Sequence, residues 1–220
     1  GGSTNGSASV NYGGSNHWIA EYFMTYNKTF NKLHHLTIVG GSTFESTNTK
    51  YVTSQASGFP SDILGVNVLQ SGLQSTYQLN SSIGQNRLNS FLGRLNYSYN
   101  DKYLLTASAR ADGTSVFSNE HKYAVFPSVA LGWRIIKEAF MKQDGVLSDL
   151  KLRASYGTIG NQAIPSYQTL TTFASSGTTV LGSQVVTGVE PTRIPNPDLR
   201  WETTAETNIG LDFGFFNQRI

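Results

Sequence analysis

Cysteine is missing from the 220-residue sequence, which excludes a disulfide framework, a thiol nucleophile and a cysteine-ligated metal site. Charged residues make up only 14% of the chain, whereas a typical globular domain has about a quarter. No run of about 18 or more apolar residues occurs, so a helical membrane protein is excluded. The net charge is only +2 and the basic residues are scattered. A nucleic-acid-binding protein shows a clustered basic patch, so we expect no nucleic acid partner.

The sequence also lacks the beginning that an exported protein needs. It opens with a polar stretch of Gly, Ser, Thr and Asn, not with the charged and then apolar segments of a signal peptide. At its other end it stops directly after a predicted turn at 216–218. We therefore interpret the sequence as a segment of a longer chain.

Strict alternation of apolar and polar residues dominates what is present, and helical periodicity is nearly absent. Alternation of this kind predicts β-strands with one apolar and one polar face. In 199–215 one face carries Trp201, Ile209 and Phe213, and every charged residue falls on the other face. The predicted strands are 17–27, 34–44, 88–99, 102–112, 124–134, 149–157 and 199–215.

Long and short connections alternate between these predicted strands. The long ones are 45–86, 113–124 and 158–198, and they are rich in Ser, Thr, Gly and Asn. The short ones include the turn at 100–101 and the segment 135–148, in which we expect a helical turn at 137–141. Long polar loops at one end and short turns at the other are typical of outer-membrane barrels, whereas soluble domains seldom contain such long loops. We therefore expect the long loops to be extracellular.

Aromatic residues gather near the ends of the predicted strands. Rings with a polar tip favour the boundary between lipid headgroups and hydrocarbon, so a membrane barrel has two aromatic bands. The candidates for these bands are Tyr97, Tyr99, Tyr103, Trp133, Trp201 and Phe213. The alternative is a soluble carbohydrate-binding β-sandwich with the same aromatic residues in its core, because alternation alone does not separate the two.

A membrane barrel must be closed, because lipid offers no partner to an unpaired backbone N–H or C=O group. Seven strands leave two open edges. The sequence therefore predicts an all-β fold, a fragment of an antiparallel transmembrane β-barrel, with the remaining strands outside this segment.

Four ordered blocks resemble the SusC/RagA family of TonB-linked outer-membrane proteins. They are DKYLLTASARADG at 101–113, FPSVALGWR at 126–134, LKLRASYG at 150–157 followed by GNQ at 160–162, and LRWETT at 199–204 followed by NIGLDFG at 208–214. A fainter match covers 18–44. The sequence departs from the family at Val116-Phe117-Ser118, where the family often has an Arg-Phe-Gly-like run, which puts the detail of one loop in doubt.

The resemblance implies a barrel of about 22 strands with a plugged lumen in the bacterial outer membrane. It also implies energy supplied by the TonB complex through an upstream segment, and a SusD-like surface lipoprotein as partner. Such transporters import oligosaccharides or peptides in Bacteroidota-like bacteria. The plug domain is not part of this chain. A passive outer-membrane porin or adhesin barrel is the alternative within the same fold.

Residues for catalysis, cofactor binding or metal binding are not found. His34 and His35 are adjacent in a predicted strand, so their side chains point to opposite faces and do not jointly hold one metal. Glu202 and Glu206 are about 13 Å apart along a strand, which is too far for the paired carboxylates of a glycosidase. We therefore expect no enzymatic activity and no cofactor.

Two sets of residues are candidates for contact with other molecules. The first lies on the polar faces of the strands, where it would line the lumen or dock the plug: Arg94, Arg110, Arg134, Arg153, Glu202 and Asp212. The second lies in the long loops, where tyrosine rings would stack on sugars: Tyr51, Tyr77 and Tyr167. Exposed loops on a rigid scaffold are where binding residues concentrate.

Overall fold

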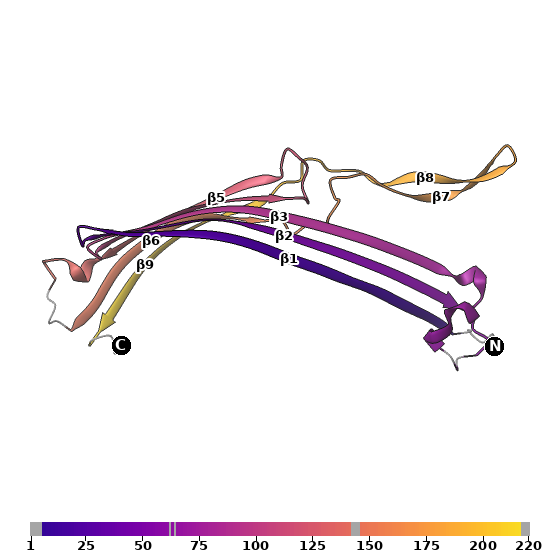
Figure 1. Cartoon of the computed structure of the whole chain (residues 1–220), viewed down its shortest axis with the longest axis horizontal. Coiled ribbons are helices and arrows are strands. Elements are labelled where there is room, and N and C mark those ends of the chain that lie inside the picture. The colour runs from indigo at the N-terminus through magenta and orange to yellow at the C-terminus, as the bar shows by residue number, and fades with distance from the viewer. Residues whose placement is uncertain (1–5, 62, 64, 142–145, 217–220) are drawn as a thin grey trace. The chain divides into compact units, whose positions relative to one another are not determined.

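The computed structural model describes residues 6–61, 63, 65–141 and 146–216. Nearly all regular structure in this part of the chain is β-strand (Figure 1). The strands are β1 (Ser7–Phe30), β2 (His34–Ser57), β3 (Gln78–Tyr99), β4 (Tyr103–Thr114), β5 (Tyr123–Arg134), β6 (Leu147–Asn161), β7 (Thr172–Leu181), β8 (Gln184–Arg193) and β9 (Glu202–Phe215). Three short 3₁₀ helices are η1 (Gly65–Ser71), η2 (Gln74–Thr76) and η3 (Ile135–Lys137). None of the helices in these residues has the length and apolar content that a membrane crossing requires.

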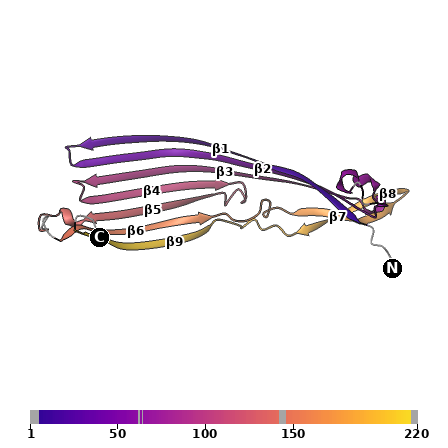
Figure 2. The ribbon, with the colours of Figure 1, turned by 90° about the horizontal axis from the view of Figure 1, so that it is seen from below.

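Seven of the described strands form one sheet in the order β1-β2-β3-β4-β5-β6-β9 (Figure 2). Strands β3, β4, β5, β6 and β9 pair antiparallel with their neighbours. The turn between β3 and β4 has positive φ at Asn100 and Asp101, as a type I′ hairpin turn requires and as Asn and Asp tolerate. Strands β7 and β8 form a separate two-stranded sheet within the connection from β6 to β9.

The chain forms two compact units. Unit 1 comprises Gly1–Ile19 and Glu45–Arg87, and unit 2 comprises Ala20–Phe44 and Leu88–Ile220. Strands β1, β2 and β3 therefore contribute residues to both units, whereas β4, β5, β6 and β9 belong to unit 2. Their lengths differ accordingly: β1 and β2 have 24 residues each, and β4 and β5 have 12 each.

The strand register in unit 2 separates the side chains into the two faces that the alternation predicts. One row of directly paired residues is Arg94, Ser108, Ser128, Gly157 and Glu206 across β3, β4, β5, β6 and β9. The next row is Leu95, Ala107, Val129, Tyr156 and Thr207. Directly paired residues share a face and neighbouring residues alternate. We call the first the polar face and the second the apolar face.

The apolar face is exposed within the described residues. Leu131 is 57% exposed, Phe213 61% and Met24 79%. The few buried apolar side chains are Ala56 and Phe59 in unit 1, and Val116, Phe117, Phe126 and Ile136 in unit 2. A soluble sandwich would bury its apolar face under a second sheet, so this exposure argues against the soluble alternative and favours a face that meets lipid.

The predicted boundaries of the first two strands and of the loop 45–86 are wrong. Strand β1 begins at Ser7 and not at 17, β2 continues from 44 to Ser57, and β3 begins at Gln78. The connection that remains is 58–77. The missed strand residues are mainly Ser, Thr, Asn and Gln on both faces, so they show no hydrophobic alternation, although Thr and Tyr favour extended backbone.

The other two long loops are also shorter than expected. Strand β4 ends at Thr114 and β5 begins at Tyr123, which leaves 115–122 in place of 113–124. The predicted loop 158–198 contains the end of β6 and the whole β7–β8 hairpin, and β9 begins at Glu202 and not at 199. The helical turn expected at 137–141 begins earlier, as η3 at Ile135. Of the turn at 216–218, residues 217 and 218 lie outside the described residues.

Candidate functional site

All six residues predicted to line the lumen share the polar face of unit 2. The register pairs Arg94 with Ser108, Arg110 with Phe126, and Gly132 with Arg153. It also pairs Arg134 with Lys151, Lys151 with Asp212, and Asn161 with Glu202. Residues from five strands thus meet on one surface. That the surface contacts a plug or a substrate stays a prediction.

Charges on the polar face are mostly paired with one another. Asp212 lies between two cations, with Arg153 at 3.1 Å and Lys151 at 4.0 Å. Arg110 contacts Asp112 at 2.7 Å and donates a hydrogen bond to the Ser90 hydroxyl at 2.9 Å. Exposed ion pairs such as Arg153–Asp212 contribute little stability. Their effect is to fix the positions of charged groups on the polar face.

Hydrogen bonds of hydroxyl and amide groups lie on the same face as these ion pairs. The Ser108 and Ser128 hydroxyls are 2.7 Å apart, and the Asn208 amide donates to Glu206 at 2.7 Å. Arg94 is exposed and has no ion-pair or hydrogen-bond partner for its side chain among the described residues. The Arg134 side chain likewise has no ion-pair or hydrogen-bond partner among the described residues, although it is less exposed than Arg94. The polar face therefore presents hydroxyl and amide groups together with two unpaired guanidinium groups.

Several residues predicted for the aromatic band lie on the apolar face at the short-turn ends of β3, β4 and β5, while a band at the membrane boundary stays a prediction. Tyr99 pairs with Tyr103, and Tyr103 pairs with Trp133, so the three rings lie in one row. The rings of Tyr99 and Tyr103 are nearly parallel, with centroids 6.3 Å apart. Tyr97 and Phe213 share the same face: the Tyr97 hydroxyl contacts His34 Nδ1 at 2.7 Å, and the Phe213 ring lies 5.7 Å from that of Phe215.

Glu138 accepts hydrogen bonds from the polar groups of two aromatic residues in this row and from a neighbouring lysine. Its carboxylate accepts hydrogen bonds from Trp133 Nε1 at 3.0 Å, from the Tyr103 hydroxyl at 2.7 Å and from Lys102 Nζ at 3.2 Å. Hydrogen bonds from Trp133, Tyr103 and Lys102 favour the charged form and lower the pKa of Glu138 to about 2. Sequence reasoning missed Glu138, because a single acid in a short connection carries no signal of its partners.

Trp201 does not join the aromatic band and is reassigned. It precedes β9, and its ring packs edge-on against Phe117 at 5.6 Å and Phe126 at 5.5 Å. Its indole N–H donates to the Lys122 carbonyl at 3.0 Å. Alternation placed Trp201 with the apolar face of 199–215, but the strand begins only at Glu202. We call Val116, Phe117, Phe126 and Trp201 the loop anchor.

The loop anchor brings together segments that are distant in the sequence. Gly160 lies under the Phe126 ring, where a Cβ atom would overlap it. The Ser118 hydroxyl donates to the Pro197 carbonyl at 2.8 Å. Three segments therefore meet at the ends of β4, β5, β6 and β9: 113–134, 160–162 and 197–202. Their contacts fix the ends of the connection between β4 and β5 and of the connection between β6 and β9.

The three candidate tyrosines have different environments. Tyr51 lies within β2 and not in a loop, and its half-exposed ring lies over Gly13, where a Cβ atom would overlap it. Tyr77 is tied down, because its hydroxyl donates to the Gln70 carbonyl at 2.8 Å. Tyr167 has a positive φ, and its carbonyl accepts a hydrogen bond from Arg193. The expectation that Tyr51 is a loop residue was wrong, while sugar stacking by any of the three stays a prediction.

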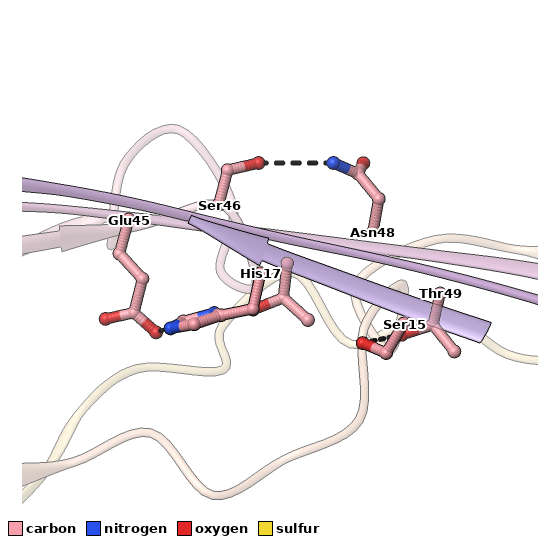
Figure 3. A network of polar contacts seen from close by, with 7 residues as sticks. Ser15, His17, Glu45, Ser46, Asn48 and Thr49 are labelled. Atoms are coloured by element: carbon pink, nitrogen blue, oxygen red, sulfur yellow. Dashed lines mark hydrogen bonds and ion pairs between the residues drawn. The ribbon is translucent and has the colours of Figure 1, made fainter. Parts of the chain in front are cut away.

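A polar network in unit 1 continues the row that contains Tyr51 (Figure 3). His17 Nδ1 contacts the Thr47 hydroxyl at 2.8 Å and lies 3.8 Å from the Glu45 carboxylate. The Ser15 and Thr49 hydroxyls are 3.2 Å apart. Figure 3 shows these side chains on one side of the strands and Ser46 and Asn48 on the other. Odd-numbered residues of β1 and β2 thus share one polar face in unit 1.

Metal binding finds no support in this part of the chain. The described residues contain no group of three or more His, Asp or Glu side chains that could hold a metal ion. His34 and His35 contact different partners, the Tyr97 hydroxyl and the Thr29 hydroxyl, as expected of neighbours on opposite faces.

Comparison with known proteins places this geometry in a family. Residues 1–220 match the family described as TonB dependent receptor-like, beta-barrel. The chain is 41% identical over 215 residues to TonB-dependent receptor P26 of Formosa agariphila, covering 98% of this chain and 22% of that protein. It is 43% identical over 143 residues to TonB-dependent receptor SusC of Bacteroides thetaiotaomicron, covering 62% of this chain and 14% of that protein. The solved structure of the RagAB peptide transporter aligns with 97% of this chain and 23% of its own, at 27% identity and a TM-score of 0.77.

The chain therefore belongs to the β-barrel family of TonB-dependent receptors. The predictions of an antiparallel transmembrane β-barrel segment, of the SusC/RagA resemblance and of an outer-membrane location are confirmed. The chain spans about a fifth of the length of the curated relative it matches over most of its own length, with 22% of that protein covered.

Proposed function

We propose that the chain forms part of the barrel wall of a transporter that imports a large nutrient across the outer membrane, driven by the TonB complex. The observation that carries this proposal is the separation of faces across unit 2. An exposed apolar face suits lipid, and a polar face with fixed charges suits a water-filled lumen. Membership of the TonB-dependent receptor family supports active rather than passive passage. No covalent chemistry is part of the proposal.

The remaining wall and the plug belong to further parts of the transporter. Strands β1 and β9 each have one neighbour in the sheet of the described residues. An unpaired strand edge in hydrocarbon costs several kcal/mol for each unsatisfied backbone group, by order of magnitude. We therefore propose that other strands of the same transporter pair with these two edges and close the barrel.

We propose that the plug contacts those charged side chains of the polar face that have no ion pair. Arg94 has no partner among the described residues, whereas Arg110 and Arg153 are engaged with Asp112 and Asp212. A free guanidinium gains most from a carboxylate presented by another domain, because it gives up no existing ion pair. Arg94 is therefore the first candidate for holding the plug.

The substrate class is an oligosaccharide or a peptide. The row Ser15, His17, Thr47, Thr49 and Tyr51 in unit 1 presents hydroxyl groups, an imidazole and a half-exposed ring. Such groups suit a long, hydrogen-bonding ligand of low charge. Of the relatives, the RagAB structure is described as a peptide transporter.

A SusD-like surface lipoprotein is proposed as the partner that covers the extracellular side. The β7–β8 hairpin is the candidate contact, because several of its large apolar side chains are exposed: Phe173, Val180, Leu181, Val185 and Val189. Its tip carries no charge between Thr172 and Val189, and uncharged strand edges readily accept a partner. On this proposal the hairpin and the other long connections face the outside of the cell.

Uptake by the complete transporter tests the proposal. Cells that express the full-length protein are supplied with labelled oligosaccharides or labelled peptides, with the TonB complex intact or disrupted. Import of one class that stops without TonB supports the proposal. Equal uptake with and without TonB would identify a passive porin, and the proposal of active transport would then be wrong.

A second comparison tests Arg94. The Arg94→Ala variant should reduce TonB-dependent uptake, whereas Arg153→Ala should have a smaller effect because its charge is already paired with Asp212. Equal uptake by Arg94→Ala and wild type would remove Arg94 from plug contact without affecting the assignment of import.

A further inference from the structure

Two cations are directly opposed on the polar face, near the short-turn ends of β5 and β6. The register pairs Arg134 with Lys151, and directly paired residues share one face of the sheet. Like charges in directly paired positions destabilise a sheet. An anion that contacts both side chains would offset this repulsion, because it adds two favourable interactions to one unfavourable interaction.

Asp212 does not supply this anion in full. It is paired with Lys151 on the neighbouring strand, yet its carboxylate lies 4.0 Å from Lys151 Nζ. Its closer partner is Arg153, whose Nε donates a hydrogen bond to Oδ1 at 3.1 Å and whose terminal nitrogen lies 3.1 Å from the same oxygen. Asp212 is therefore held mainly by Arg153, and its ion pair with Lys151 is the weaker of the two.

Other acids near these cations do not bridge them either. Asp149 lies on β6 two residues from Lys151, about 7 Å along the strand, and it has no ion pair among the described residues. Asp101 and Glu138 are engaged in ion pairs with other lysines. The side chain of Arg134 has no ion-pair or hydrogen-bond partner in the part of the chain that the structure describes.

Glycines on the same face let the neighbouring cations lie across the sheet. Gly132 is two residues before Arg134, and a Cβ atom there would come 3.5 Å from Lys151 Cε. A Cβ atom at Gly210 would come 2.8 Å from Arg153 Nε, which is too close for the present side-chain position. The two glycines therefore allow Lys151 and Arg153 to lie against the sheet.

Water reaches the two opposed cations, so a ligand also reaches them. The side chain of Lys151 is 29% exposed, and Arg134 is half-buried. Charges that are partly shielded from water interact more strongly with a ligand than fully exposed ones. A guanidinium donates two parallel hydrogen bonds to a carboxylate, sulfate or phosphate group, and an ammonium adds a point charge. A neutral hydroxyl or amide group would leave the repulsion uncompensated.

We propose that Arg134 and Lys151 form an anion site that binds a carboxylate, sulfate or phosphate group. The observation that selects this class is the pair of like charges with no carboxylate between them. Arg94 differs, because its direct partner on β4 is the neutral Ser108. The anion comes either from solution, as on a transported molecule, or from an acidic side chain of the plug. The site goes beyond the proposed import, which assigns no ligand to Lys151.

Phosphate binding to the purified full-length transporter tests the proposal. Inorganic phosphate is titrated in detergent at low salt, and calorimetry measures its affinity. Lys151→Gln and Arg134→Gln should each weaken phosphate binding about ten-fold, because a charge-assisted hydrogen bond is lost. Asp212→Asn should strengthen it about three-fold, because a competing exposed ion pair is removed. A variant that merely unfolds would not gain affinity.

Lys28→Gln is the matched control. Lys28 lies on β1 with its Nζ 5.9 Å from the centroid of the Phe30 ring, so its loss removes the same charge away from the site. Its phosphate affinity should equal that of wild type. Thermal unfolding of each variant checks that the barrel remains folded.

The same variants distinguish the two sources of the anion. Phosphate binding by wild type shows that the site is open to solution. If a carboxylate of the plug occupies the site, wild type binds no phosphate, and Lys151→Gln and Arg134→Gln lower the urea concentration at which the plug leaves the barrel, whereas Lys28→Gln does not. Plug release is followed as the onset of ion conductance through the full-length protein in planar bilayers.

Three results would overturn the proposal. Equal phosphate affinity of wild type, Lys151→Gln and Arg134→Gln would remove the two cations from the site. An equal loss of affinity with Lys28→Gln would show a nonspecific charge effect. Absence of phosphate binding together with unchanged plug release in both variants would show that the pair holds no anion. Because phosphate binding is measured without uptake, the site can fail while TonB-dependent import stands, and the reverse.

Discussion

Strands β1 and β2 pass through both units, and the same face changes its chemistry between them. In unit 2 this face carries Ala20, Tyr22, Met24, Tyr26, Leu36 and Ile38. In unit 1 it carries the polar residues Asn16, Ser46, Asn48 and Lys50 beside Tyr12, Trp18 and Val52. Both stretches have the same backbone pairing. We therefore attribute the difference in side-chain polarity to different surroundings of the strands. We expect lipid beside the first stretch and more polar surroundings beside the second.

A second contrast concerns how each unit is held together. Unit 2 has a small buried group, the loop anchor, in which Val116 is 2% and Phe117 4% exposed. In unit 1 the corresponding buried apolar side chains are Ala56 and Phe59. In both units most large apolar side chains are exposed, so neither unit has an extensive apolar core among the described residues.

Disruption of the loop anchor should give the largest effect. Phe126→Ala should destabilise the folded barrel by about 3–5 kcal/mol, because it removes a buried ring and leaves a cavity beside Trp201 and Gly160. The measurement is the free energy of unfolding of the full-length protein in lipid vesicles. Val125→Ala, on the exposed apolar face of the same strand, should cost far less. Equal costs would show that the anchor does not pack as described.

An arginine scan along one face tests the contrast between the units directly. Met24→Arg should cost about 2–4 kcal/mol if that side chain faces the middle of the bilayer. Asn16→Arg, on the same face of the same strand but in unit 1, should cost about 0–1 kcal/mol. The same vesicle unfolding assay measures both variants.

A second pair on unit 2 separates the two faces. Leu131→Arg should resemble Met24→Arg, while Ser108→Arg, on the polar face, should cost little because the added charge stays in water. If Ser108→Arg and Leu131→Arg are equally tolerated, or equally damaging, the assignment of faces is wrong.

The same contrast explains which features the sequence could predict. Residues inside lipid must alternate strictly, so β4, β5 and the central parts of β6 and β9 are recognisable from pattern alone. Outside lipid both faces are polar, as at Asn48 and Thr49, and the strand pattern disappears although the backbone continues. The strands 7–16, 45–57 and 78–87 were therefore read as absent or as loop.

Site residues follow the same logic. Arg94, Arg110, Arg134, Arg153, Glu202 and Asp212 were placed on one face correctly, because parity along a strand is a local property. Trp201 was misplaced, since parity ends where the strand ends, and its partners Phe117 and Phe126 are distant in sequence. Glu138 was missed for a similar reason, because its three donors come together only when β4 and β5 pair.

Acid sensitivity should be smaller than the arginine effects and confined to the Glu138 cluster. The folded-state pKa of Glu138 is about 2, below its usual value of 4.5. A carboxylate with a lowered pKa stabilises the fold above its unfolded pKa, and that contribution is lost as pH falls through the folded pKa. We expect Trp133 fluorescence to change between about pH 4.5 and pH 2. The full-length Glu138→Gln variant should show a reduced change in this range, and an identical titration would exclude Glu138 as the cause.

The substitutions used for surface labelling should change stability least. They test which ends of the strands face the outside of the cell. Thr178 lies in the exposed β7–β8 hairpin, and Lys137 lies in the short connection after β5. This segment contains no cysteine, so Thr178→Cys and Lys137→Cys each introduce its first thiol, and any cysteine elsewhere in the full-length transporter is replaced beforehand. An impermeant maleimide applied to intact cells should label Thr178→Cys and leave Lys137→Cys unlabelled until the outer membrane is opened. The reverse pattern would place the short connections outside the cell and the β7–β8 hairpin on the periplasmic side, and would remove the hairpin as a contact for a surface lipoprotein.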